Sequence, residues 1–119
     1  MSVAELVSKF YNSDALTKHQ IISTYLHDDL EVFWHSTEGY VHFNREDLIN
    51  YASKLETSYH ASRFEITHLL KDDEHVTVRY THFVNPIENP EQELVLAHFM
   101  AIWHVKDHKL FKGYVMSQL

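Results

Sequence analysis

Apolar residues in the first half of the chain recur at helical spacing. The first such group is Val3, Leu6, Val7, Phe10 and Tyr11. Neighbouring members on one face are three or four residues apart, which predicts an amphipathic helix. A second helix is predicted to present Ile21, Ile22, Tyr25 and Leu26 to the core. A third is predicted to begin at an Asn44 cap, with Asp47 near its positive end, and to bury Leu48, Ala52, Leu55 and Tyr59.

The period then changes from helical to alternating. One short strand is expected earlier, at Leu30–Ser36, where apolar and polar residues take turns. From about Ala61 the alternation becomes continuous and is interrupted only by short polar turns and one loop that holds both prolines. The four strands predicted from this pattern are residues 63–70, 76–84, 94–105 and 110–116.

This order of elements predicts an α+β fold in a single domain, residues 1–119. Its expected order is α-α-β-α-β-β-β-β. A long antiparallel sheet in so small a chain must curve, and the three N-terminal helices are what its concave side can enclose. We therefore expect a cone-shaped half-barrel whose interior is the place for a site.

The predicted strand 94–105 is apolar on both faces. Antiparallel strands with one wet face normally alternate cleanly, so both faces of this strand need cover. Helices can cover one face. We expect a second copy of the chain to cover the other, giving a homodimer through the outer face of the sheet. The alternative is that this outer face is apolar without being an interface.

Composition excludes several classes of function. The chain has no cysteine, hence no disulfide and no thiolate chemistry, and it has a formal net charge of −7 without a Lys/Arg cluster. We expect no nucleic-acid partner and no membrane partner. The N-terminus lacks the basic and apolar parts of a signal peptide, and the longest apolar run is too short for a bilayer, so a cytoplasmic protein is expected. The eleven histidines would reverse the net charge if all were protonated.

Two segments carry a resemblance to a known family. Residues 25–34, with Asp28-Asp29 before a strand, are similar to the entry of the first strand in the nuclear transport factor 2-like superfamily. Residues 102–110 are similar to its penultimate strand, turn and final strand. Together with the order of elements, they make the chain resemble this superfamily, which includes SnoaL-like polyketide cyclases and ketosteroid isomerases. The resemblance implies a cystatin-like α+β fold and one SnoaL-like domain over the whole chain.

The chain departs from the family where catalysis would be. Trp34 stands where isomerase-like members carry a base aspartate, and Ala101 where they carry a second acid. A tryptophan cannot take a proton from a substrate. The glycine of the final turn is replaced by His108-Lys109. An isomerase or cyclase activity is therefore not inferred from the resemblance.

The residues expected to line the cone are mainly aromatic. The predicted ligand pocket consists of Tyr11, Tyr25, Trp34, Tyr80, His82, Phe99 and Trp103. Such a lining suits a small apolar or aromatic molecule, whereas the plainer interpretation is that the rings fill the core. His82 is the candidate catalytic residue, as a general acid/base; the alternative is a core histidine bonded to a carbonyl or to Tyr80.

Neither a metal nor a cofactor is expected. There is no His-Glu-x-x-His pattern, no phosphate-binding glycine loop and no nucleophile elbow. Convergence of His68, His82 and His98 from different strands is the one metal alternative. Three hypotheses remain open. The first is a small-molecule-binding domain with no assigned reaction. The second is an enzyme of isomerase, cyclase, hydrolase or lyase type that uses His82 as general acid/base. The third is a dimeric interaction module with a filled core.

Overall fold

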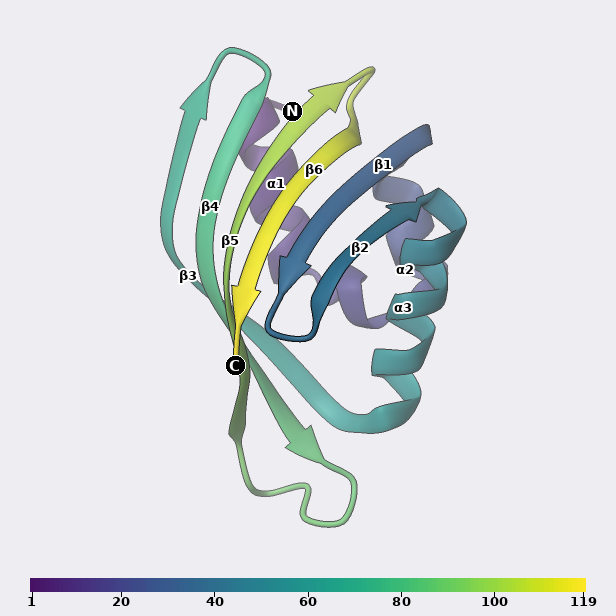
Figure 1. Ribbon diagram of the computed structural model, residues 1–119, viewed down its shortest axis with the longest axis vertical. Helices are drawn as coiled ribbons and strands as arrows, with labels where there is room; N and C mark the ends of the chain where they lie inside the picture. The colour runs from purple at the N-terminus through teal and green to yellow at the C-terminus, as the bar shows by residue number, and fades with distance from the viewer.

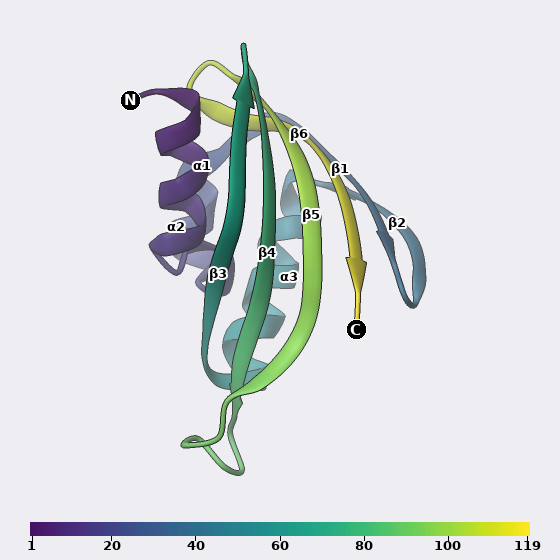
Figure 2. The ribbon, with the colours of Figure 1, turned by 90° about the vertical axis from the view of Figure 1, so that its left-hand side faces the viewer.

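The computed structural model describes residues 1–119 as one curved sheet with every helix on its concave side (Figures 1 and 2). The helices are α1 (Val3–Asn12), α2 (His19–Ile22) and α3 (Arg45–Ser58). The strands are β1 (Leu26–Ser36), β2 (Gly39–Asn44), β3 (Tyr59–Asp72), β4 (His75–Pro86), β5 (Leu94–Lys106) and β6 (Lys109–Gln118). The strand order across the sheet is β2-β1-β6-β5-β4-β3. The predicted α+β class and cone-like arrangement are confirmed.

Two of the three predicted helices form, with one correction: Tyr59, expected on the buried face of the third helix, is the first residue of β3, because α3 ends at Ser58. In α1, the side chain of Ser2 accepts a hydrogen bond from the backbone of Glu5, and the apolar stripe is buried. Asn44 and Asp47 form a reciprocal capping box at the start of α3, with bonds of 2.8 and 2.9 Å. Such a cap supplies partners for amide groups that have none within the helix. It fixes where α3 begins and therefore where its inner face points.

The second predicted helix is mostly wrong. The helical part, α2, has only four residues and lies between two short 3-10 turns, Ala15–Thr17 and Ser23–Tyr25. Ser23 and Thr24 donate their hydroxyl protons to main-chain carbonyls three residues back. Such local bonds compete with a regular helix. The chain can then turn at once into β1, which starts at Leu26 rather than at Leu30.

One strand, β2, was not predicted from the sequence. β2 is a six-residue edge strand that pairs antiparallel with β1, in a stretch where only the Asn44 cap of the third helix was expected. Its side chains are almost all exposed, so it lacks the apolar alternation that marks a buried strand. The turn before it depends on Gly39, whose φ of +123° is a conformation other residues avoid. A further difference is that β1 runs parallel to β6, so the sheet is mostly rather than wholly antiparallel.

The four strands β3 to β6 confirm the alternating half of the sequence, with one correction. A bulge in β3 between Ile66 and His68 moves His68 and Leu70 to the convex side, although the alternation alone places them beside Phe64. A second bulge lies between His82 and Phe83, where β4 pairs with β5. An extra residue in one strand bends it and increases its twist. These bulges therefore contribute to the curvature that makes the sheet enclose the helices.

With glycine scarce, other residues take the left-handed backbone positions in the turns. Asp107 and His108, between β5 and β6, have φ values of 54° and 60°. Positive φ at both central residues is the pattern of the tight hairpin turn that suits twisted strands. Asp73 does the same between β3 and β4, with φ of 53°. The β3–β4 and β5–β6 hairpins thus close at their expected positions without glycine, unlike the β1–β2 hairpin, which uses Gly39.

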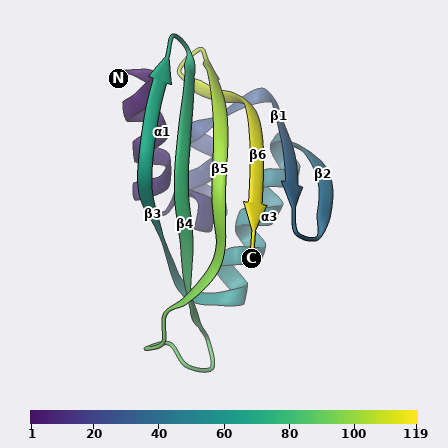
Figure 3. The same ribbon diagram turned by 60° about the vertical axis from the view of Figure 1, so that its left-hand side comes forward.

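Figure 3 shows the strands nearer the viewer than the helices, so the convex face of the sheet carries no cover. Four large apolar side chains from β5 and β6 lie on this face: Met100, Ile102, Tyr114 and Met116, which are 53%, 42%, 45% and 65% exposed. They form one patch, because Met100 pairs with Met116 and Ile102 pairs with Tyr114 across the two strands. We call these four residues the convex patch.

Candidate functional site

The concave side of the sheet brings together most of the predicted pocket residues. Six of the seven line a small inner cavity of about 30 Å³: Tyr11, Trp34, Tyr80, His82, Phe99 and Trp103. Strand alternation explains this, since Tyr80 and His82 share one face of β4 and stand opposite Phe99 and Ala97 of β5. The volume holds one or two water molecules. The rings therefore fill nearly all of the cone, as the core-filling interpretation expects.

Tyr25 lies apart from this cavity. Its ring packs edge-on against Phe10 at 5.6 Å between centroids, and its hydroxyl is 3.1 Å from that of Ser13. Tyr25 lies in the 3-10 turn that leads into β1. It contributes to the core rather than to a cavity wall.

A buried polar pair crosses the inner cavity. The indole Nε1 of Trp103 donates a hydrogen bond of 2.8 Å to the hydroxyl of Tyr11, and the ring of Tyr80 lies 4.4 Å from that of Tyr11. Burial raises the pKa of Tyr11 to about 12 and raises that of Tyr80 well above its usual value. Both phenols are therefore neutral at physiological pH, and they offer hydrogen bonds rather than charge.

His82 has an unusual environment. The side chain is 1% exposed and stacks on Phe64 at 4.3 Å, and its Nε2 has no hydrogen-bond partner within the protein. The expected bond to a carbonyl or to Tyr80 is not formed. Burial lowers the pKa of His82 to about 4, so the imidazole is neutral near pH 7. A buried polar atom without a partner costs free energy, and such atoms often mark a functional position.

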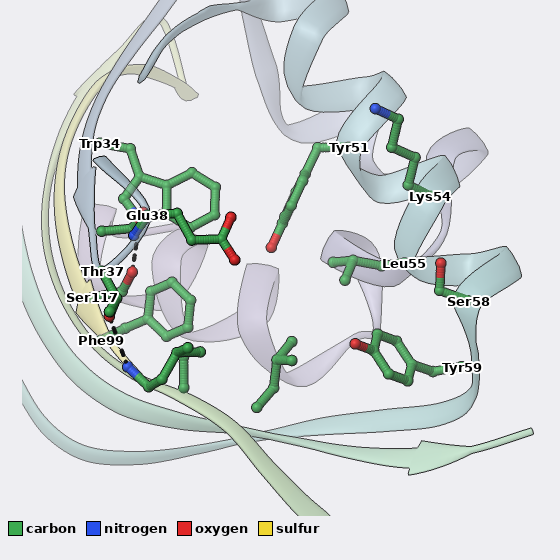
Figure 4. A pocket seen from close by; sticks show the side chains of 14 residues that line it. Trp34, Thr37, Glu38, Tyr51, Lys54, Leu55, Ser58, Tyr59, Phe99 and Ser117 are labelled. Carbon is green, nitrogen blue, oxygen red and sulfur yellow. Dashed lines mark hydrogen bonds between the residues drawn. The ribbon is translucent and has the colours of Figure 1, made fainter. Parts of the chain in front are cut away.

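A larger pocket opens where the cone widens. We call it the mouth pocket; its volume is about 280 Å³, and it lies between α3, the β1–β2 turn and the ends of β5 and β6 (Figure 4). Trp34, Tyr51 and Phe99 line both the mouth pocket and the inner cavity. These three rings therefore form a partition between the mouth pocket and the inner cavity, and His82 lines the inner cavity but not the mouth pocket.

The polar groups of the mouth pocket come from both of its sides. On the sheet side, Trp34 donates its Nε1 proton to the Ser117 hydroxyl at 2.8 Å, which fixes the indole. Figure 4 shows the carboxylate of Glu38 pointing into the pocket toward the hydroxyl of Tyr51. The pKa of Tyr51 is raised to about 12, mainly by burial and further by Tyr59 and the Glu38 carboxylate. Tyr51 is thus neutral as well.

Sequence reasoning named only Trp34 and Phe99 among the 14 residues of this pocket. Tyr51 and Leu55 lie four residues apart on α3, so they share a helix face, and Leu55 was expected in the core. That spacing could have indicated Tyr51 as a wall residue. Nothing local indicates Glu38, because the turn that carries it belongs to the strand pair that the alternation did not reveal.

The histidines do not converge on a metal site. His82 faces the cavity, whereas His98 and His68 lie on the convex side. His98 is 3.0 Å from the hydroxyl of Thr81 through its Nδ1. No group of three His, Asp or Glu side chains lies close enough together to hold a metal ion. No helix is both long enough and apolar enough to cross a membrane.

Comparison with known proteins was informative only at the level of structure. No family model and no curated protein matches the sequence. Wild-type IdmH of Streptomyces antibioticus, a proposed polyketide cyclase, is 9% identical over 98% of this chain and 92% of its own, with a TM-score of 0.78. A proposed SnoaL-like polyketide cyclase from Jannaschia sp. CCS1 is 10% identical over 97% and 84%, with a TM-score of 0.71.

A third solved structure was determined in complex with a small molecule. It is a protein of Catenulispora acidiphila DSM 44928 with a ketosteroid isomerase-like fold, bound to trimethylamine. It is 13% identical over 93% of this chain and 83% of its own, with a TM-score of 0.73. The chain has the nuclear transport factor 2-like fold. Structural similarity at such low sequence identity identifies the fold and assigns no activity, since one fold hosts many activities.

Proposed function

We propose that this NTF2-like protein binds a small apolar or aromatic molecule in its mouth pocket. The observation that carries the proposal is the partition formed by Trp34, Tyr51 and Phe99, which offers aromatic surface at the base of an open pocket. The volume, about 280 Å³, is close to the lower end of the range of about 300–1,000 Å³ that is usual for small-molecule sites. A ligand with one or two rings fits such a space. The small ligand of one fold neighbour and the names of two others support this kind of occupant.

The site differs from the one expected from sequence in its position. The inner cavity is too small for an organic ligand, so the bound molecule would rest on the outer side of the three rings instead of among them. No carboxylate lines the inner cavity. The acid/base chemistry of paired carboxylates therefore has no residues there to perform it, and binding without a reaction is the function we favour.

A blocking substitution tests this proposal. Ala97 lines the mouth pocket but not the inner cavity, so Ala97→Leu adds volume where the ligand would lie. Ala61→Leu makes the same change at an exposed position on β3 outside this pocket and is the matched control. A library of small aromatic fragments screened by ligand-observed NMR should give hits for the native protein and for Ala61→Leu that Ala97→Leu loses. A library without hits, or with hits that survive Ala97→Leu, would overturn the proposal.

We further propose that the protein acts as a homodimer through the convex patch. A contiguous group of four large apolar side chains, each more than two-fifths exposed, is typical of an interaction surface. The patch continues into an aromatic row, because Phe33 stacks on Tyr114 at 5.5 Å and on His42 at 4.8 Å. A second copy of the same face provides matching apolar surface, and the mouth pocket lies on the opposite side of the sheet and stays open.

A second candidate function rests on His82. Its unpaired Nε2 lies in the wall of the inner cavity, directly behind the partition, and the neutral imidazole is a base at neutral pH. An enzyme of isomerase, lyase or hydrolase type would need Trp34 or Tyr51 to move so that substrate reaches this nitrogen. Under this alternative, His82→Gln abolishes turnover of a ligand found in the fragment screen and leaves its binding nearly unchanged. A screen hit that the native protein never converts speaks against it.

A further inference from the structure

The charged residues of the mouth pocket are unequally placed. Glu38 and Lys54 are the charged side chains among its 14 lining residues. In Figure 4 the Glu38 carboxylate points into the pocket, whereas the Lys54 ammonium points away along the outer side of α3. A molecule inside the pocket therefore meets a negative charge at close range and a positive charge only at a distance.

The Glu38 carboxylate is also free to pair with a ligand. Its oxygens take part in no salt bridge and no hydrogen bond within the protein, unlike those of Glu31, which lie 3.3 Å from Lys112 and 3.4 Å from His42. The main chain holds the turn instead: the Glu38 amide donates to the Ser36 hydroxyl at 3.2 Å, and Leu119 donates to Thr37 at 3.1 Å. These bonds fix the direction of the Glu38 side chain and leave its carboxylate without a partner in the protein.

The opposite walls of the mouth pocket are aromatic. Trp34 and Phe99 come from the sheet, and Tyr51 and Tyr59 come from α3 and the start of β3 (Figure 4). The indole of Trp34 and the ring of Tyr51 are 5.3 Å apart and nearly perpendicular, at 81°. The two rings therefore meet edge to face in the wall of the pocket. The face of an aromatic ring attracts a cation, most strongly for tryptophan.

From this arrangement we infer that the mouth pocket selects organic cations, namely amines or quaternary ammonium groups on a small apolar body, with Glu38 as the counter-ion. The inference rests on the proposed binding function and specifies its ligand class. Anionic ligands are disfavoured, because Glu38 repels them and the net charge of −7 opposes their approach. A neutral ligand gains the aromatic contacts but neither the ion pair nor the cation–π attraction.

Three probes separate the effect of charge from that of shape. The para-hydroxyphenyl trimethylammonium ion and para-tert-butylphenol have the same shape, but the first has a charged quaternary nitrogen where the second has a neutral quaternary carbon. The third probe, para-hydroxybenzenesulfonate, carries a negative charge. Each is titrated at neutral pH while the indole N–H resonance of Trp34 is followed by NMR. The cation should bind roughly tenfold tighter than its neutral isostere, the sum expected of an exposed ion pair and a cation–π contact.

Glu38→Gln removes the ion pair but not the cation–π contact, so it should reduce the preference for the cation to about two- to fivefold. Glu88→Gln, the same change in the exposed β4–β5 loop, should leave the full preference intact. Equal binding of cation and isostere to the native protein, or tighter binding of the sulfonate, would overturn the cation inference and leave the proposed binding function standing. Failure of all three probes, together with an empty fragment screen, would overturn both.

Discussion

Trp103 and Tyr11 are joined by a buried hydrogen bond of 2.8 Å from the indole Nε1 to the phenolic oxygen. This bond connects β5 to α1, elements separated by most of the chain, and it crosses the interior of the cone. Both side chains are buried, at 4% and 2% exposure, so the bond is shielded from bulk solvent. The pair holds the first helix at a fixed position in the curved sheet.

Removing the acceptor tests this connection. Tyr11→Phe keeps the ring but leaves the Trp103 N–H buried without a partner, and we expect a loss of about 1–3 kcal/mol in the free energy of unfolding. Urea denaturation measures it. Tyr40→Phe is the matched control, because Tyr40 is half exposed and its hydroxyl has no partner. Equal stability of the two variants would show that the buried bond contributes nothing.

Gly113 explains how Trp103 fits against the sheet. The two residues face each other across β5 and β6, and a Cβ at Gly113 would lie 2.5 Å from the Trp103 ring. Gly113→Ala should therefore destabilise the fold by about 1–3 kcal/mol through overpacking. In the background of Trp103→Phe, whose ring is smaller, the same change should cost clearly less. A double-mutant cycle by urea denaturation measures this, and simple additivity would exclude the close approach as the cause.

His82 should make the stability of the protein sensitive to acid. Its folded-state pKa of about 4 lies below the ordinary value of 6.5, so between these pH values the unfolded chain takes up a proton that the folded chain does not. The contribution of His82 to the free energy of unfolding is fully present above about pH 6.5. It is lost as the pH falls toward 4, and the loss is about 3 kcal/mol. Comparing urea denaturation at about pH 7 and about pH 4.5, the loss on acidification should be smaller in His82→Gln than in the native protein. Identical losses would place His82 outside this effect.

The convex patch makes a prediction about oligomeric state. Replacing Met100 and Met116 together by Glu puts two charges at the centre of the proposed interface and should yield monomers in sedimentation velocity experiments. Leu70→Glu, a similarly exposed apolar position near the tip of the β3–β4 hairpin, should leave the dimer intact. A native protein that sediments as a monomer would contradict the proposed homodimer directly.

The sequence predicted secondary structure correctly where the signal lies within a single helix or strand. The capping box of Asn44 and Asp47 is local, and so is the alternation that buries Val76, Val78 and Tyr80. The bulge after Ile66 could not be predicted, since an extra residue in one strand is defined only by its partner strand. The edge strand β2 stayed hidden because it buries almost nothing.

The site was harder to predict than the fold. Aromatic residues on the inner faces could be recognised from alternation, but whether Tyr11, Tyr80 and Trp103 enclose a pocket or fill it depends on how the rings pack together. The mouth pocket is built from the β1–β2 turn, α3 and the ends of β5 and β6, which are remote in sequence. Glu38 enters it only because a turn of an unforeseen hairpin points inward.

The two tryptophans allow the central claim, that ligands occupy the mouth pocket and not the inside of the cone, to be measured in one experiment. Trp34 lines both spaces and bonds its Nε1 to Ser117 of the mouth pocket, whereas Trp103 lines the inner cavity but not the mouth pocket. A ligand inside the cone therefore shifts the Trp103 indole resonance, and a ligand in the mouth pocket shifts that of Trp34 without it. Each resonance is assigned by a Trp→Phe variant and followed while a bound fragment or the trimethylammonium probe is titrated. We predict a saturable shift of the Trp34 resonance with little change at Trp103. A shift confined to Trp103, or none at either indole, would contradict the account.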